Sequence, residues 1–349
     1  MNRNTIDSVK SILNSRRVFF PILLGVATVV LIMCLDKTFT LQNLMLFKNI
    51  SLHGLLASIG ALILRDFLYV LRIRLLVNKK LGWSSCFIII MLWEFSSAVT
   101  PSAVGGGFVA VFLFLHEGIS LGEAMAYVLL SAIFDNYFFI IGVPLSYLGL
   151  PAHSSILTNH WLNTMFWLSY ILILLYASIM TFSLFIKPEL FKKLMLKITS
   201  FKFLKKFNKS AIEQGNNLIS ASLVLKQHSF GFWIVILLIT LVTWFSRYII
   251  LNFIISGFVD MHFNEHIVIL CKHLVMWITM LISPSPGGSG FIEYCFNNLY
   301  KDDLGNYTII IALIWRFLTF YIYLFAGLCI LPSWLRSFKK NNKKDLSNV

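Results

Sequence analysis

The sequence predicts an all-α protein that crosses a membrane several times, and three observations support this prediction. Of the 349 residues, 58% are hydrophobic and only 13% are charged, whereas soluble domains are roughly one quarter charged. Several apolar runs reach about 18 residues or more, and roughly 20 helical residues span the hydrocarbon core of a bilayer. The positive charges gather between these runs, as membrane topology requires.

Six apolar runs are predicted to cross the membrane completely. They occupy residues 18–35, 52–77, 121–148, 163–186, 231–258 and 305–333. The first run follows Arg16 and Arg17, as the apolar region of a signal peptide follows basic residues. No small-residue cleavage site comes after it, so we expect this run to be retained. Two further runs, about 86–116 and 266–300, are interrupted by Pro and Gly. Each is predicted to be a re-entrant hairpin of two short helices.

The distribution of lysine and arginine predicts the orientation. If both hairpins enter and leave on the same side, one compartment receives 22 of the 29 basic residues and the other receives three. We therefore expect a protein of a bacterial-type inner (plasma) membrane with both termini in the cytoplasm. Arg72 and Arg74 are interpreted as topology charges whose side chains extend to the interface. The predicted parts are a first membrane half (1–186), a basic connector (187–229), a second half (230–335) and a basic tail (336–349).

The two interruptions resemble each other. The segment from Pro101 to Ala110 aligns without gaps on the segment from Pro284 to Glu293, with identical Pro, Ser, two Gly and Phe. Under the predicted topology the two hairpins enter from opposite faces. The halves are therefore predicted to be inverted-topology repeats, an architecture found in many secondary transporters.

Ionisable residues inside the apolar segments indicate a buried polar centre. A charge at the centre of a bilayer costs at least ~2.5 kcal/mol on insertion scales, so each should face the protein interior with a partner. These residues are Arg65, Asp66, Glu94, Asp135, Arg247, Lys272, Glu293 and Arg316. They are either structural ion pairs that pin the helices together or the lining of a cavity that holds an anionic headgroup.

The candidate substrate site combines guanidinium groups, carboxylates and glycine N–H groups. Guanidinium suits phosphate, and bare N–H groups at a helix start favour an anion; the alternative is that the glycines only permit tight turns and close packing. Arg65 and Asp66 are adjacent and point about 100° apart, so at least one must reach another helix. The candidate substrate-binding residues are Arg65, Arg247, Arg316, Glu94, Asp135, Glu293, Gly105, Gly107, Gly288 and Gly290.

Other functions receive less support. The net charge of +14 lies mainly in loops between spans, which argues against a nucleic-acid partner. The five cysteines include no C-x-x-C, and no G-x-S-x-G or metal-ligand cluster occurs. We therefore expect no cofactor, no metal and no catalytic residue.

The connector 187–229 carries nine lysines against Glu189 and Glu213. Its apolar residues follow a loose helical spacing from Leu190 to Leu204. This pattern favours an amphipathic helix on the anionic inner leaflet; the alternative is a lysine-rich link between the halves.

Three motifs resemble the lysylphosphatidylglycerol synthase transmembrane region, also described as a flippase-like domain. They are Pro284-Ser-Pro-Gly-Gly-Ser-Gly-Phe-Ile-Glu293, the span with Ile314-Trp315-Arg316-Phe317, and the loop from Ser97 to Gly107 followed by Glu123-Ala124 and Asp135. The resemblance covers roughly residues 10–335. The first loop departs from the family pattern, because Gly107-Phe108 stands where a Gly-Glu pair is usual.

The resemblance implies an integral membrane lipid translocator without the soluble aminoacyltransferase domain of some family members. Its substrate would be an anionic or zwitterionic lipid headgroup, on a phospholipid or a polyprenyl-phosphate-linked sugar. The alternative is a membrane-embedded transferase, or an accessory subunit that works with a synthase or glycosyltransferase.

Overall fold

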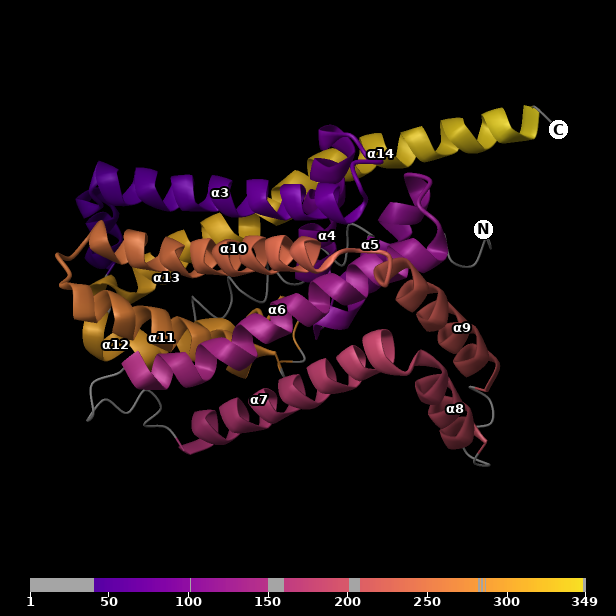
Figure 1. Ribbon diagram of the computed structural model, residues 1–349. Helices are drawn as coiled ribbons and strands as arrows, with labels where there is room; N and C mark the ends of the chain where they lie inside the picture. Colours follow the sequence, from indigo (N-terminus) through magenta and orange to yellow (C-terminus); the bar gives the residue numbers. More distant parts are fainter. Residues whose placement is uncertain are drawn as a thin grey trace.

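The computed structural model describes residues 41–100, 102–149, 160–200, 208–281, 283, 285 and 287–347. These residues form helices and connecting turns, with no strand among them (Figure 1). The predicted first span, 18–35, lies outside this part. The elements are η1 (Leu41–Asn49), α3 (Leu52–Leu76), α4 (Trp83–Val99), α5 (Ser102–His116), α6 (Leu121–Gly149), α7 (His160–Thr181), η2 (Phe182–Ile186), α8 (Pro188–Thr199), α9 (Asn208–Leu225), α10 (Phe230–Ser256), α11 (Phe263–Met280), α12 (Phe291–Leu304), η4 (Gly305–Tyr307), α13 (Thr308–Arg316), η5 (Phe317–Tyr321) and α14 (Ile322–Ser347).

Five helical stretches in the described residues are long and apolar enough to cross a membrane. They are Leu52–Leu76, Leu121–Ser146, His160–Ile186, Phe230–Ser256 and Phe291–Trp334. The last stretch runs from α12 into α14, and Gly305, with φ of 50°, ends α12 within it. The predicted all-helical, multi-span class is therefore confirmed.

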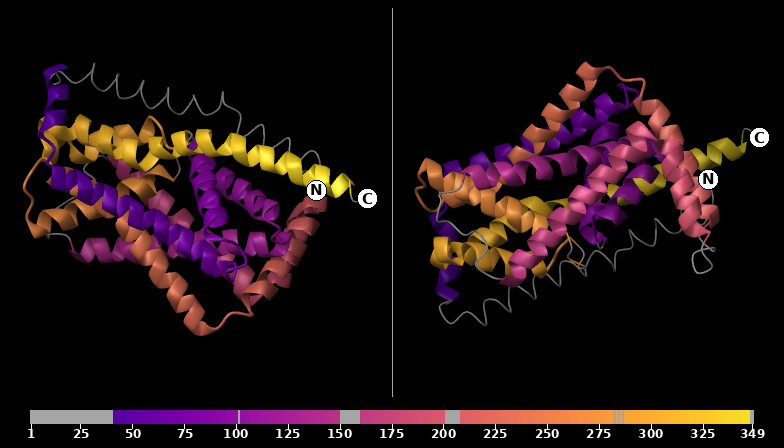
Figure 2. Two further views of the ribbon diagram at one scale, coloured as in Figure 1. Left: turned by 90° about the horizontal axis from the view of Figure 1, so that it is seen from above. Right: turned by 60° about the horizontal axis from the view of Figure 1, so that its bottom comes forward.

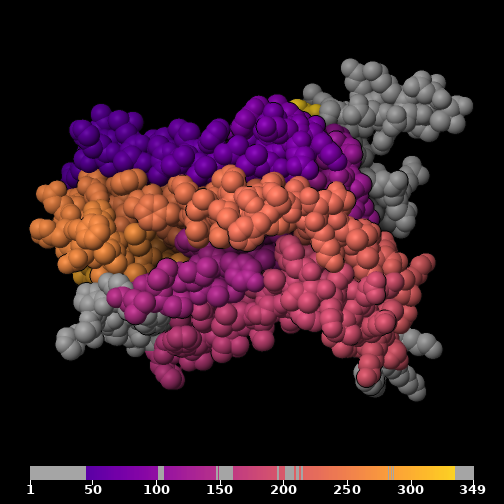
Figure 3. All heavy atoms as spheres, in the orientation of Figure 1, coloured from indigo at the N-terminus to yellow at the C-terminus, as the bar shows by residue number. Residues whose placement is uncertain are grey.

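Helices α3 and α10 lie side by side along the length of the molecule (Figure 3), and contacts near both ends show that they are antiparallel. The N–H of Ser51, before α3, donates to the carbonyl of Gly257, after α10, at 2.7 Å. Gly54 and Gly257 permit this close approach, because a Cβ on Gly54 would lie 2.5 Å from the Cα of Gly257. Near the other end, Arg72 of α3 donates to Thr240 of α10 at 3.2 Å.

Helices α4 and α5 form a short helical hairpin that follows α3. Its two arms pack closely, since a Cβ on Gly106 would lie 3.0 Å from the Cβ of Ser97. At the open end, Lys80 pairs with Glu123 at 2.6 Å. The chain therefore enters and leaves this hairpin at the same end of the molecule.

Helices α11 and α12 form the corresponding hairpin after α10. The hydroxyl of Tyr300 donates to the carbonyl of Ile269 at 3.3 Å, and Lys272 donates to the carbonyl of Leu299 at 3.0 Å. Lys272 also forms an ion pair with Asp303. The arms are therefore antiparallel and the Pro/Gly segment is their tip.

The two hairpins lie at opposite ends of the α3–α10 pair (Figure 1), and their tips are in contact. The first follows the carboxyl end of α3, and the second follows the carboxyl end of α10. A Cβ on Gly287, in the second tip, would lie 3.0 Å from the carbonyl oxygen of Ala98, in the first tip. Residues almost 190 positions apart in the sequence thus meet in the interior.

The connector contains two helices, α8 and α9. Helix α9 packs against α6, where a Cβ on Gly122 would lie 3.0 Å from the Cβ of Ser220. Helix α8 packs against α9, and Lys192 of α8 donates to Asn216 of α9 at 2.6 Å. Both helices lie at one end of the bundle (Figure 2).

Candidate functional site

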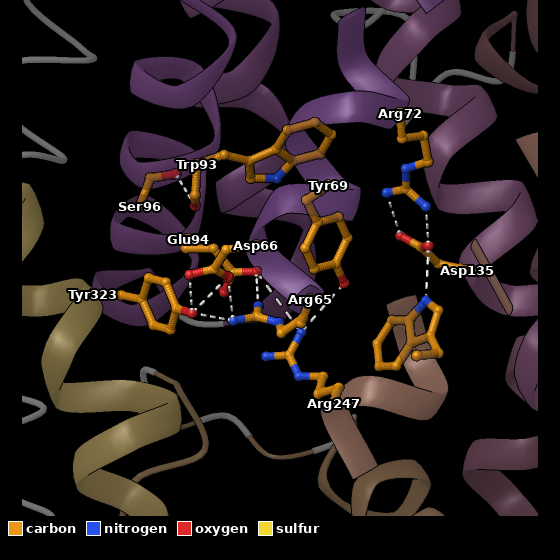
Figure 4. A network of polar contacts seen from close by, with 11 residues as sticks. Arg65, Asp66, Tyr69, Arg72, Trp93, Glu94, Ser96, Asp135, Arg247 and Tyr323 are labelled. Atoms are coloured by element: carbon orange, nitrogen blue, oxygen red, sulfur yellow. Dashed lines mark hydrogen bonds and ion pairs between the residues drawn. The ribbon is translucent and has the colours of Figure 1, made fainter. Parts of the chain in front are cut away.

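Charged residues of three helices and a tyrosine of a fourth meet beside the tip of the first hairpin (Figure 4). Arg65 of α3 forms ion pairs with Glu94 of α4 and with Asp66, the latter at 3.1 Å. The hydroxyl of Tyr323, on α14, contacts Arg65 and donates to the carboxylate of Asp66 at 2.7 Å. Arg65 therefore reaches another helix as expected, but it also contacts its neighbour Asp66. The side chain of Arg65 is long enough to bend back to Asp66, although the helix directs the Cα–Cβ bonds of these two neighbours about 100° apart.

Arg247 of α10 lies at the edge of this cluster with weaker polar contacts. Its Nη1 lies 3.8 Å from Glu94 and 3.5 Å from the hydroxyl of Tyr69. Its guanidinium carbon lies 4.4 Å from the ring centre of Trp277 and 5.3 Å from that of Trp244. The indole faces hold the cation by cation–π attraction, so Arg247 keeps donor capacity that the carboxylates do not saturate.

A second ion pair joins α3 to α6. Arg72 Nη1 lies 2.6 Å from Asp135 Oδ1, and the indole N–H of Trp244 donates to the same oxygen at 2.8 Å. Arg72 is buried, with 3% of its side chain exposed. The interpretation of Arg72 as a topology charge at the interface is therefore wrong, because it neutralises Asp135 inside the bundle. Tyr69 connects this pair to the main cluster, since Arg65 and Arg72 each lie 5.0 Å from its ring centre.

A third pair lies at the second hairpin tip. Arg316 Nε donates to Glu293 at 2.8 Å, and its Nη2 donates to Ser289 at 3.2 Å. Both charged side chains are almost fully buried, at 5% and 2% exposed. The predicted charged site is thus divided: Arg65, Glu94 and Arg247 are together, Asp135 joins Arg72, and Arg316 joins Glu293.

The candidate glycines occupy two different settings. Gly105 and Gly107 lie within α5, which begins at Ser102, and only N–H groups of the first turn lack helical acceptors. Gly288 and Gly290 lie in the second tip with φ of 68° and 87°. Their N–H groups already have acceptors, the carbonyl of Ser285 at 3.0 Å and the carboxylate of Glu293 at 2.7 Å.

One helical segment connects the third pair to the main cluster. Arg316 ends α13, Tyr323 lies in the first turn of α14, and the π-helical η5 lies between them. Within η5, Phe320 stacks on Arg316, with the guanidinium carbon 4.0 Å from the ring centre, and it also packs against Gly287. Such π-helical turns are rare and are frequent at functional sites.

A cavity lined by described residues lies elsewhere, at the end of the bundle where α3, α6 and α9 meet. It is open and polar, with a volume of about 650 Å³, and its lining includes Lys80, Glu123 and His228. Burial lowers the pKa of His228 below its ordinary value. This cavity contains none of the candidate substrate-binding residues.

The structure adds partners that the sequence reasoning did not select. They are Tyr69, Arg72, Trp244, Trp277 and Tyr323. Two of them could have been found from helical spacing, which places residues three or four apart on the same face: Tyr69 follows Arg65 by four residues, and Trp244 precedes Arg247 by three. Nothing in the sequence indicated Tyr323, which belongs to the last helix.

Comparison with known proteins identifies similar membrane proteins. A curated protein of Archaeoglobus fulgidus named UPF0104 membrane protein is 25% identical over 274 residues, which cover 74% of this chain and 80% of the relative. No solved structure matches the chain. The family model for the lysylphosphatidylglycerol synthase TM region matches residues 19–327. With helices that can span a membrane and a match over most of its length, the chain is a membrane protein that belongs to the lysylphosphatidylglycerol synthase TM region family.

Proposed function

We propose that this protein moves a lipid headgroup between the two leaflets of a bilayer. The headgroup bears a phosphate and is carried on a phospholipid or a polyprenyl-phosphate-linked sugar. The flippase-like role is consistent with the family, and the arrangement of charge inside the bundle supports it.

The proposed architecture has the two hairpins as re-entrant elements of inverted-topology repeats. Three observations support it. Their open ends lie at opposite ends of the α3–α10 pair, their tips touch through Gly287 and Ala98, and α4 and α5 have only 17 and 15 residues. Since about 20 helical residues span the hydrocarbon core, neither arm of the first hairpin crosses it fully.

The proposal depends mainly on one observation, the weak pairing and partial exposure of Arg247. The guanidiniums of Arg65, Arg72 and Arg316 each form a close ion pair, whereas Arg247 lies 3.8 Å from the nearest carboxylate of the described residues. Its side chain is 12% exposed, against 1% for Arg65. A guanidinium held by indole faces, whose polar contacts with the described residues are long, is suited to bind phosphate.

Transport requires the hairpins to move in turn. In this conformation the tips are in contact and Arg65 is buried, so a headgroup reaches Arg65 only when one tip withdraws. Opening of the first hairpin moves Glu94 away from Arg65 and Arg247, and opening of the second moves the Arg316–Glu293 pair. Each opening exposes the cluster to one face, as alternating access demands.

Replacement of Arg247 tests the proposal. In vesicles with fluorescent phospholipid, Arg247→Gln is expected to lower the transbilayer rate at least about tenfold, because a hydrogen bond to a charged group contributes about 1.5–3 kcal/mol. Arg247→Lys should be intermediate, since it keeps the charge without the planar fork. Arg74→Gln is the matched control, because Arg74 donates to the carbonyl of Leu81 away from the cluster.

An Arg247→Gln protein that moves lipid at the wild-type rate would contradict the role of Arg247 as a phosphate ligand, and a folded wild-type protein that moves no lipid would contradict the proposed translocation. A purified protein that instead makes a covalent product from lipid and donor would favour the transferase alternative. Activity that appears only after co-purification with a synthase or glycosyltransferase would favour the accessory-subunit alternative.

For the orientation, we propose that the end with α8 and α9 faces the cytoplasm, together with both termini. The concentration of lysine and arginine supports this. Along α8, Leu190, Leu194 and Ile198 recur at four-residue intervals and are exposed, while Lys193 and Lys197 lie on the same helix. We propose that α8 rests on the anionic inner leaflet, with these apolar side chains inserted. A cysteine at Leu194 that is labelled only by reagents added outside the cell would contradict the orientation.

A further inference from the structure

The buried cluster is electrically balanced within the described residues. Arg65 and Arg247 share Asp66 and Glu94, and the two flanking pairs each match one arginine with one carboxylate. Neither sign is in excess. A site that opens to bind a bare phosphate would therefore gain an uncompensated negative charge on closing, and burial of an unpaired charge is strongly unfavourable.

The accessible atoms of this cluster include both signs. Exposed fractions are 21% for the side chain of Asp66, 19% for Glu94 and 12% for Arg247, whereas Arg65 is buried. An incoming headgroup therefore meets one guanidinium and two carboxylates before it meets Arg65. A carboxylate that is reachable from outside the cluster is suited to contact a cationic group rather than a phosphate.

From this balance we infer that the preferred substrate is a zwitterionic phospholipid, whose headgroup carries one phosphate and one amine. The inference rests on the proposed translocation. The phosphate binds Arg247 in place of its long contact with Glu94, and the ammonium binds the carboxylates of Asp66 and Glu94. The rings of Tyr69 and Tyr323, each about 5 Å from the guanidinium carbon of Arg65, form walls that attract cations.

The exchange keeps every charge matched at each step. Glu94 contacts Arg65 and lies 3.8 Å from Arg247. When phosphate takes over Arg247, Glu94 retains Arg65 and gains the ammonium. The closed cluster then holds three positive and three negative groups. A purely anionic or a purely cationic headgroup leaves one group unmatched in the same position.

The test compares two lipids with the same acyl-chain fluorophore, phosphatidylethanolamine and phosphatidylglycerol, in vesicles that contain the full-length protein. The expected result is a transbilayer rate at least about tenfold higher for the zwitterionic lipid, equivalent to about 1.4 kcal/mol. Glu94→Gln removes one negative charge and should shift the ratio of the two rates towards the anionic lipid. Asp66→Asn is the second variant, in case Glu94→Gln does not fold.

Each outcome supports or overturns a different statement. Equal rates for both lipids, or a faster rate for phosphatidylglycerol, overturn the zwitterion inference and leave translocation intact. An unchanged ratio in both variants shows that this charge balance does not select the substrate and likewise overturns the inference. Absence of movement for both lipids, in protein shown to be folded by its thermal transition, overturns the proposed translocation of phospholipids.

Discussion

The two hairpin tips have similar sequences but use their glycines differently. In the first tip the glycines lie inside α5, and Gly106 lets α5 approach Ser97 of α4. In the second tip, Gly287, Gly288 and Gly290 all have positive φ, and they let the chain turn between α11 and α12. This difference teaches that a shared Pro/Gly pattern predicts where an apolar run is interrupted, but not which backbone conformation the interruption has. One tip depends on close helix packing and the other on backbone conformation.

The tips also differ in how their charges are held. Glu94 near the first tip is 19% exposed and is shared between two arginines, whereas Glu293 at the second is 2% exposed and belongs to Arg316. Glu293 also accepts the N–H of Gly290 at the start of α12. This makes the Arg316–Glu293 pair the more rigid of the two, and suggests substitutions that act on one tip alone.

The largest expected effect is at the second tip. Glu293→Gln should lower the free energy of unfolding by about 3–5 kcal/mol, because it leaves the charge of Arg316 buried without a partner. Denaturant unfolding in detergent measures this change. Asp302→Asn, an exposed position on the same helix, is the control and should have little effect. The double variant Glu293→Gln, Arg316→Gln should recover most of the loss, and no recovery would contradict the ion-pair explanation.

At the first tip, alanine in place of Gly106 should destabilise the protein mainly by overpacking the contact between α4 and α5. Gly106→Ala is expected to cost about 1–3 kcal/mol, the usual range for an extra methyl group in a closely packed interior. The new methyl group would lie 3.0 Å from the Cβ of Ser97 and 3.1 Å from its Cα. Ser97→Gly in the same chain should therefore restore most of the stability, as a double-mutant cycle can measure.

A glycine-to-alanine substitution at the second tip should behave differently. Gly290→Ala is expected to cost about 1–2 kcal/mol, since L-residues with a Cβ are disfavoured at positive φ. This cost comes from the backbone conformation, so Gly290→Asn should not reduce it, because ψ of −52° places Gly290 outside the left-handed helical region that Asn tolerates. Thermal unfolding of the three proteins measures the order. If a neighbouring truncation rescued Gly290→Ala, the contrast between the two tips would disappear.

Much of the interior was predictable because the membrane makes buried charges conspicuous. Arg65, Glu94 and Arg247 were selected as residues of one site, and the structure brings them together. Their selection needed only the cost of charge in an apolar segment. The hairpins were selected from Pro and Gly within apolar runs, and the arms of both are present as short helices.

The remaining features depend on three-dimensional distance, which a single sequence does not contain. Arg72 lies close to a predicted helix end, so its burial could not be inferred until α6 brought Asp135 beside it. The separation of Arg316 from the main cluster was also not predictable from the sequence, because it depends on the hydrogen bonds that Arg316 donates to the nearby Glu293 and Ser289. The two different roles of the tip glycines could be told apart only from their φ angles, and φ depends on where each helix begins.

The smallest expected effect concerns the open end of the first hairpin. Lys80→Ala removes the ion pair with Glu123, but 53% of the Lys80 side chain is exposed. Exposed pairs contribute about 0.2–1 kcal/mol, so stability should fall by no more than this, and the loss should vanish at high salt. Glu123 retains the hydroxyl of Ser120 as a donor at 2.8 Å, which further limits the change. Thermal unfolding at low and at molar salt measures the difference. A loss as large as that of Glu293→Gln would mean that the open end, rather than the tip contact, holds the first hairpin in place.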